Sequence, residues 1–192
     1  MIDTTLAKRY AKALVEIAHP KFRAELAEAA ETFELLMNRK TLTAAPYFWL
    51  AGIYSQLEQH EDTAATCEQI LYRFFPLGMK FLAKPSYKNP LYSQFYYTLG
   101  SAYLELNRYY DALAAFKKIL KSHNYKKTNS YNFRIFYPTS QLGARAFYAL
   151  VHYKLGIAYS SRGDRDEAMA QYKKLKKLDK EKAEKLLNII ER

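Results

Sequence analysis

The sequence is poor in cysteine, in glycine and proline, and in long apolar runs. Its 192 residues include one cysteine, six glycines and six prolines. The single cysteine, Cys67, cannot form an internal disulfide, which favours a reducing compartment. No apolar stretch approaches the roughly 18 residues that cross a bilayer, and the first residues lack the apolar centre of a secretory leader. We therefore expect an intracellular, cytoplasmic protein, and leave open an organelle or a membrane-associated complex.

Strand-like alternation and catalytic motifs are also scarce. Hydrophobic residues make up 49% of the sequence, enough to bury a core, and few stretches alternate as strands do. The four histidines are scattered, without partners at metal-ligand spacing. Gly100 and Gly156 belong to no glycine-rich phosphate loop. The sequence therefore predicts an all-α protein that is not an enzyme and needs no metal or cofactor.

What the sequence does contain is a spaced pattern that occurs twice, with its copies 56 residues apart. Each copy has Leu-Gly-x-x-Tyr, then an alanine, then an aromatic residue, at the same intervals. The copies are Leu99, Gly100, Tyr103, Ala112 and Phe116, and Leu155, Gly156, Tyr159, Ala168 and Tyr172. This spacing is typical of two antiparallel helices that touch at small residues, with aromatic rings filling the remaining space.

The pattern resembles the tetratricopeptide repeat, a 34-residue helical hairpin that usually binds other proteins. The resemblance implies an all-α superhelix of antiparallel helix hairpins. The family's tryptophan position falls on Tyr96 and His152, and its closing proline on Asn124 and Lys180. A weaker copy lies upstream. Its matches to the family positions are Phe48, Gly52, Ala64, Leu71 and Pro76, with Tyr54 one residue from the expected aromatic. That copy is either shifted by one residue in its first helix or only repeat-like.

We divide the chain accordingly into a helical pair, three repeats and a cap. A helical pair over 1–40, with helices near 4–18 and 22–39, precedes about three repeats within 41–182. The final helix, Lys180 to Ile190, caps the array, and 183–192 is its end. The copies are spaced further apart than one 34-residue unit, and the extra residues predict two insertions. Part of each extra stretch could instead lengthen the next helix. The repeats are 45–78, 93–126 and 149–182, and the insertions lie near 79–92 and 127–148.

The opening segment, Leu6 to Ala18, also resembles the first helix of the delta (OSCP) subunit of the F-type ATP synthase. The resemblance covers 13 residues, and the repeats that follow depart from that family. It implies a structural or assembly subunit of a larger membrane-associated complex. The alternative is a capping helix for the repeat stack.

Basic residues concentrate in the middle of the chain. Residues 69–163 hold fourteen Lys or Arg against two acidic residues, and fourteen of the eighteen tyrosines. Such a surface favours an acidic protein partner, with nucleic acid or an anionic membrane surface as alternatives. Its candidate partner-binding cations are Lys117, Lys121, Arg134, Arg145 and Lys154.

The family resemblance also implies where a partner binds. The first helix of each repeat lines a concave groove, and the position after the tryptophan site holds Trp49, Tyr97 and Tyr153. Aromatic groups there suit a bulky peptide. Further groove positions are Gln94, Ser101, Leu104, Leu150 and Ile157. We expect a non-enzymatic scaffold that binds a protein or peptide, while packing between repeats remains an alternative for each tyrosine. A nucleic-acid-binding repeat protein is the other alternative, and the oligomeric state is left open.

Overall fold

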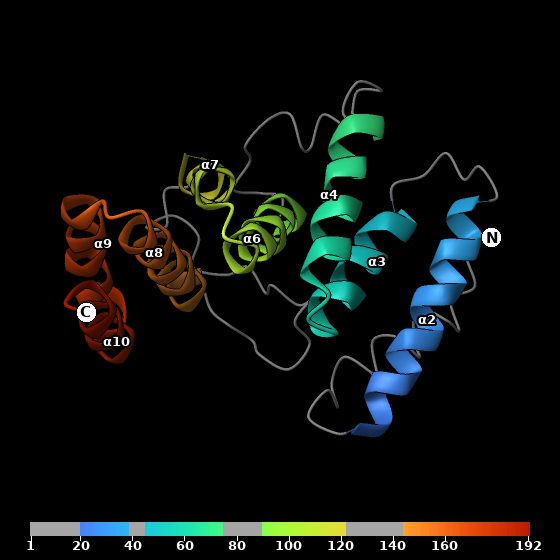
Figure 1. Cartoon of the computed structure of the whole chain (residues 1–192), viewed down its shortest axis with the longest axis horizontal. Coiled ribbons are helices and arrows are strands. Elements are labelled where there is room, and N and C mark those ends of the chain that lie inside the picture. The colour runs from blue at the N-terminus through green and yellow to red at the C-terminus, as the bar shows by residue number, and fades with distance from the viewer. Residues whose placement is uncertain (1–19, 39–44, 75–89, 122–143) are drawn as a thin grey trace. The chain divides into compact units, whose positions relative to one another are not determined.

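The computed structural model describes residues 20–38, 45–74, 90–121 and 144–192, all in helices and the short turns between them (Figure 1). The chain divides into two compact units, which we describe separately. The regular elements of the described residues are all α-helices, which confirms the all-α prediction. The helix predicted over 4–18, with its ATP synthase resemblance, lies outside these residues, as do most of both predicted insertions.

The first unit contains α2 (Pro20–Asn38), α3 (Ala45–Gln56) and α4 (His60–Phe74). Proline suits the first position of α2, because its missing N–H would have no partner there. Helix α3 packs between the other two helices. The core of this unit lies between α2 and α3. It is built from Leu26, Ala30, Phe33, Leu50 and Ile53.

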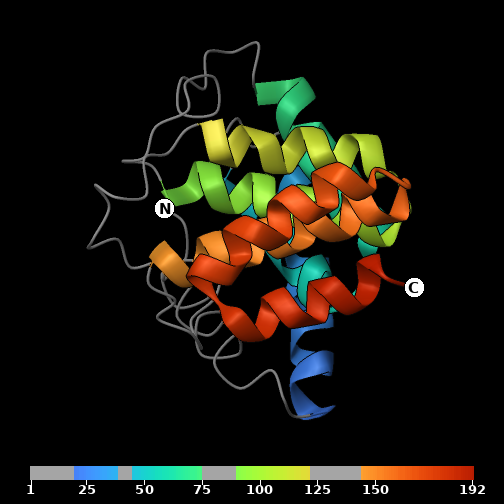
Figure 2. The same cartoon turned by 90° about the vertical axis from the view of Figure 1, so that its left-hand side faces the viewer.

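The described residues of the second unit form five helices. Figure 2 shows them side by side. They are α6 (Pro90–Glu105), α7 (Tyr109–Lys121), α8 (Ala144–Ser161), α9 (Arg165–Leu178) and α10 (Lys180–Ile190). Helix α6 pairs with α7, α8 pairs with α9, and α7 packs against α8. Helix α10 packs on both α8 and α9. Because α6 and α8 begin before residues 93 and 149, part of each surplus lengthens the first helix of the following repeat.

Three helix hairpins share one turn geometry. The residue two before the second helix has a left-handed backbone in each: Glu58 with φ 61°, Asn107 with φ 59° and Gly163 with φ 80°. Glycine adopts this conformation without steric cost and asparagine tolerates it, whereas glutamate is strained there. The recurrence aligns the α3–α4 hairpin with the two repeats residue by residue.

This alignment corrects the expected register of the first hairpin by one residue. The backbone N–H of Gln59 donates to the Tyr54 carbonyl at 2.9 Å, as Arg108 donates to Tyr103 at 2.8 Å and Asp164 to Tyr159 at 2.9 Å. Tyr54 therefore takes the repeat's tyrosine position. The shift extends into the second helix, where the N–H of Thr63, rather than Ala64, makes the bond that Ala112 and Ala168 make. The shift in the first helix is one of the two alternatives that the sequence left open. The match of Ala64 is corrected, because the turn rather than Gly52 sets the register.

The small residues lie where helices come close, as predicted. Ala112 and Ala168 are fully buried. A Cβ atom added to Gly100 would lie 2.8 Å from Cε1 of Phe116, on the second helix of the same repeat. One added to Gly156 would lie 2.7 Å from Cδ1 of Leu186, which belongs to α10. Both glycines therefore permit close packing, but against different partners.

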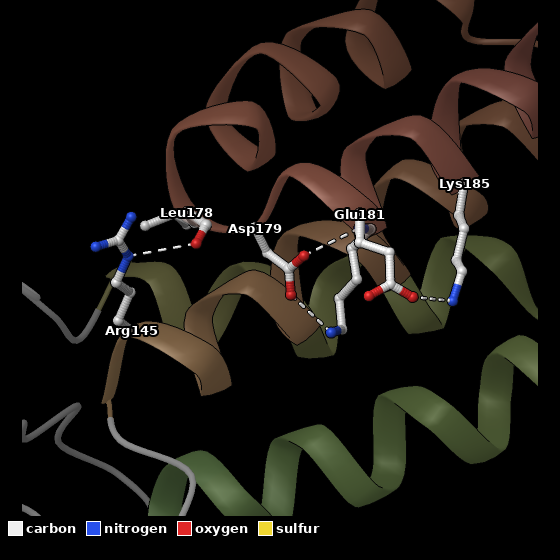
Figure 3. A network of polar contacts seen from close by, with 6 residues as sticks. Arg145, Leu178, Asp179, Glu181 and Lys185 are labelled. Carbon is white, nitrogen blue, oxygen red and sulfur yellow. Dashed lines mark hydrogen bonds and ion pairs between the residues drawn. The ribbon is translucent and has the colours of Figure 1, made fainter.

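Helix α10 closes the second unit with the apolar face that its sequence predicted. Ala183, Leu186 and Ile190 are buried, and Leu187 is partly buried. Asp179 alone separates α9 from α10 and caps α10, because its carboxylate accepts the Lys182 backbone N–H at 3.0 Å (Figure 3).

Candidate functional site

One face of α8 carries a row of partly buried side chains. The row consists of Leu150, Tyr153, Lys154 and Ile157. Leu150 and Ile157 each lie three or four residues from Tyr153 and Lys154, so the four share this face, and all keep some exposure. We call them the α8 face. It combines apolar and aromatic surface with one cation, which is the composition that a peptide anchor needs.

Residues of α6 and α10 adjoin the α8 face. Lys154 Nζ donates to Glu105 Oε1 of α6 at 3.1 Å. On α10, the Glu181 carboxylate, with a smaller contribution from the Tyr153 phenol, raises the pKa of Lys185. Figure 3 shows Lys185 paired with Glu181. The cations beside this face are thus largely neutralised by neighbouring carboxylates.

Three predicted groove residues of α6 lie in the interior instead. Gln94, Tyr97 and Leu104 are 3%, 8% and 7% exposed. The Tyr97 ring packs against Phe116 of α7 and Phe147 of α8, with centroids 6.1 and 5.5 Å away. Burial raises the pKa of Tyr97 to about 12. The expectation of an accessible groove position is therefore corrected for these three residues, which are buried; rings from α7 and α8 cover Tyr97. Ser101 of the same helix remains partly exposed.

Trp49 lies in the first unit and packs partly buried against its α2–α3 core. With the register corrected, Phe48 rather than Trp49 is the residue equivalent to Tyr97 and Tyr153. Phe48 is 9% exposed. Of the predicted groove aromatics, Trp49 and Tyr153 both remain partly exposed, but Trp49 packs against the α2–α3 core.

The predicted basic residues divide between structural and exposed positions. Arg145 donates to the Leu178 carbonyl at 3.3 Å (Figure 3). It also donates to the Lys177 carbonyl at 2.9 Å, and the two bonds cap the end of α9. Lys117 places its ammonium 5.3 Å from the centre of the Tyr159 ring, and Lys121 is exposed. Arg134 lies outside the described residues.

The family's tryptophan position is buried and polar in both predicted repeats. Tyr96 accepts a hydrogen bond from Lys118 Nζ at 3.3 Å, and the ammonium lies 4.6 Å from the ring centre. His152 Nδ1 lies 2.9 Å from Gln171 Oε1 and, since an amide oxygen only accepts, Nδ1 donates. Burial lowers the pKa of His152. The spacing places His152 at this family position, but no sequence signal points to its partner Gln171.

The described residues hold few groups suited to covalent or metal chemistry. Cys67 is fully buried, and burial raises the pKa of its thiol, which disfavours the reactive thiolate. Among the residues that the structure describes, no three or more His, Cys, Asp or Glu side chains gather as metal ligands would. No helix in the same residues has the length and apolar character of a membrane span.

Comparison with known families identifies the helical repeats. The tetratricopeptide repeat family matches residues 93–131 and 149–182, which cover most of the α6–α7 and α8–α9 hairpins. Searches of curated proteins and of solved structures give no match. The two segments match the tetratricopeptide repeat, and the described helices form an all-α helical repeat fold of that type. Such repeats generally mediate protein–protein interaction rather than catalysis. The family match does not reach the α3–α4 hairpin, whose status as a repeat stays a prediction.

Proposed function

We propose that this protein is a non-enzymatic scaffold that holds a segment of a partner protein against the α8 face. The observation that supports this most directly is the partly buried row of Leu150, Tyr153 and Ile157 within a tetratricopeptide repeat. Tyrosine and aliphatic side chains gain large contact area at a low cost in side-chain entropy.

The partner segment has apolar anchors in this proposal. Lys154 is already paired with Glu105, and Lys185 with Glu181, so charge beside the α8 face adds little to affinity. The net charge of +11 acts at longer range. It accelerates encounter with an acidic partner without requiring acidic groups at every contact. We therefore propose a partner that is acidic overall and binds through bulky apolar residues.

A peptide selection tests this proposal. The full chain is screened against a phage-displayed library of random peptides, and the enriched peptides are synthesised for binding measurements. We expect enriched peptides to carry aromatic or branched aliphatic residues near acidic ones. Tyr153→Ala should weaken their binding by about tenfold or more, as for an interface anchor worth over 1 kcal/mol.

Tyr72→Ala provides the control, because Tyr72 is 86% exposed and lies on α4 in the first unit. Both variants are checked for unchanged helicity and thermal unfolding. Equal binding by Tyr153→Ala, Tyr72→Ala and the unchanged protein would refute the α8 face as the site. Failure to enrich any peptide would refute the peptide-binding mode itself.

A further inference from the structure

The second helices of the two matched repeats carry lysines at equivalent positions. Lys117 and Lys121 of α7 recur 56 residues later as Lys173 and Lys177 of α9. Each pair is four residues apart, so its side chains share one face of their helix. All four are exposed. We call these four residues the lysine face.

No acidic residue interrupts this arrangement. Residues 112–163 contain no Asp or Glu, and neither do residues 168–178. In the part of the chain that the structure describes, none of the four lysines lies within ion-pairing distance of a carboxylate. This contrasts with the α8 face, where Glu105 and Glu181 pair with the local cations. The basic excess of the second unit therefore remains unneutralised on α7 and α9.

The lysine face lacks apolar anchors. The large hydrophobic side chains that the described residues leave exposed are Leu35, Tyr72 and Tyr110, of which Tyr110 alone belongs to these two helices. Tyr110 is already covered by the Arg162 guanidinium, 3.9 Å from its ring centre. A protein interface draws its affinity from buried aromatic or aliphatic anchors and is depleted in lysine. An amphipathic membrane contact likewise needs apolar side chains to insert.

We infer that the lysine face binds the phosphate backbone of nucleic acid without reading its sequence. Backbone binding needs only positive charge at regular intervals, because its affinity comes from the release of condensed counterions. Nearby tyrosines are occupied by cations, as in the Lys117–Tyr159 and Lys176–Tyr172 contacts. They do not serve as platforms for base stacking, so duplex is bound at least as well as single strand. This activity is separate from the α8 face and does not depend on it.

Binding of a fluorescent DNA duplex of mixed sequence to the full chain tests the inference. Affinity is measured between about 50 and 200 mM salt, the range over which phosphate contacts weaken steeply. The test variant combines Lys117→Gln, Lys121→Gln, Lys173→Gln and Lys177→Gln. We expect the slope of log affinity against log salt to become shallower by about 0.9 for each lysine removed.

A matched control removes the same charge elsewhere in the second unit. It combines Arg165→Gln, Lys180→Gln, Lys185→Gln and Arg192→Gln, all at exposed positions. Circular dichroism confirms the helical content of both variants, and the control should keep the slope of the unchanged protein within about one unit. Equal loss in both variants would overturn the inference, because net charge alone would then explain binding.

Competition separates nucleic acid from other polyanions. Vesicles containing phosphatidylserine and a polyglutamate peptide are added at equal total charge. The inference predicts that neither displaces the duplex efficiently, and that single-stranded DNA of equal length binds no tighter than duplex. Displacement by vesicles would assign the face to a membrane surface, and displacement by polyglutamate to an acidic protein. Either result, or the absence of duplex binding at about 50 mM salt, overturns it.

Discussion

The two matched repeats share a hairpin and its turn geometry but use their equivalent residues differently. Gly100 receives Phe116 from its own repeat, whereas Gly156 receives Leu186 from α10. Phe116 is completely buried, while Tyr172 at the equivalent position is partly exposed. The difference follows from what comes next in the chain: only Asp179 separates α9 from α10, which packs on both α8 and α9. The repeat pattern thus fixes where a close contact forms, and the neighbouring helix decides which side chain fills it.

The largest effect expected from this difference concerns the aromatic position. Phe116→Ala removes a fully buried ring from beside Gly100 and should lower the free energy of unfolding by about 3–5 kcal/mol. Tyr172→Ala removes a partly exposed ring and should cost about 1–2 kcal/mol. Urea unfolding with hydrogen exchange of α6–α9 measures both losses. Similar losses in the free energy of unfolding would mean that Tyr172 contributes to the core as much as Phe116 does, despite the packing of α10.

A smaller effect is expected where α10 meets Gly156. Gly156→Ala places a Cβ against Leu186, a clash costing about 1–3 kcal/mol. The gain in helix propensity offsets about 1 kcal/mol of this cost. Amide hydrogen exchange should show loss of protection concentrated in α10. Adding Leu186→Ala removes the obstructing side chain, so the double variant should lose less stability than the sum of the two single variants.

Gly100→Ala is the matched control, because its Cβ would press on Phe116 instead. It should loosen α7 and leave the exchange of α10 unchanged. Protection lost from α10 in both variants, or in neither, would contradict the assignment of separate partners to the two glycines.

The sequence was sufficient to predict features that depend on local spacing. The two repeats, their buried Ala112 and Ala168, and the apolar face of α10 all follow from periods of three and four residues. Accessibility could not be predicted in this way. Tyr97 and Tyr153 occupy equivalent positions, yet Tyr97 is covered by Phe147 from the following repeat. That contact depends on how far apart two helices pack, which no single helix encodes.

The first hairpin shows a second limit of sequence reasoning. Gly52 matched the family's glycine and attracted the alignment, whereas Ala51 occupies that position once Tyr54 is aligned through the turn. Alanine is small enough to serve there, so the spacing alone did not distinguish the two registers. The left-handed backbone of Glu58 at the turn could not be predicted from its residue type, because glutamate rarely adopts that conformation.

The smallest expected effect concerns the buried polar position, which holds Tyr96 in one repeat and His152 in the other. Burial, and secondarily the nearby Lys174, lowers the pKa of His152, although its bond with Gln171 partly opposes this shift. The unfolded chain therefore takes up a proton more readily than the folded chain as the pH falls below the ordinary histidine value. The stabilisation contributed by neutral His152 is complete above that value and is lost in acid.

His152→Tyr, which copies the other repeat, should flatten the loss of stability between about pH 7 and pH 5. The reciprocal Tyr96→His should steepen it, since Lys118 faces that position as Lys174 faces His152. Thermal unfolding across this pH range measures both changes. If the dependence of stability on pH is unaltered in His152→Tyr, another group controls the acid sensitivity. The positions of Tyr96 and His152 would then differ in packing but not in charge.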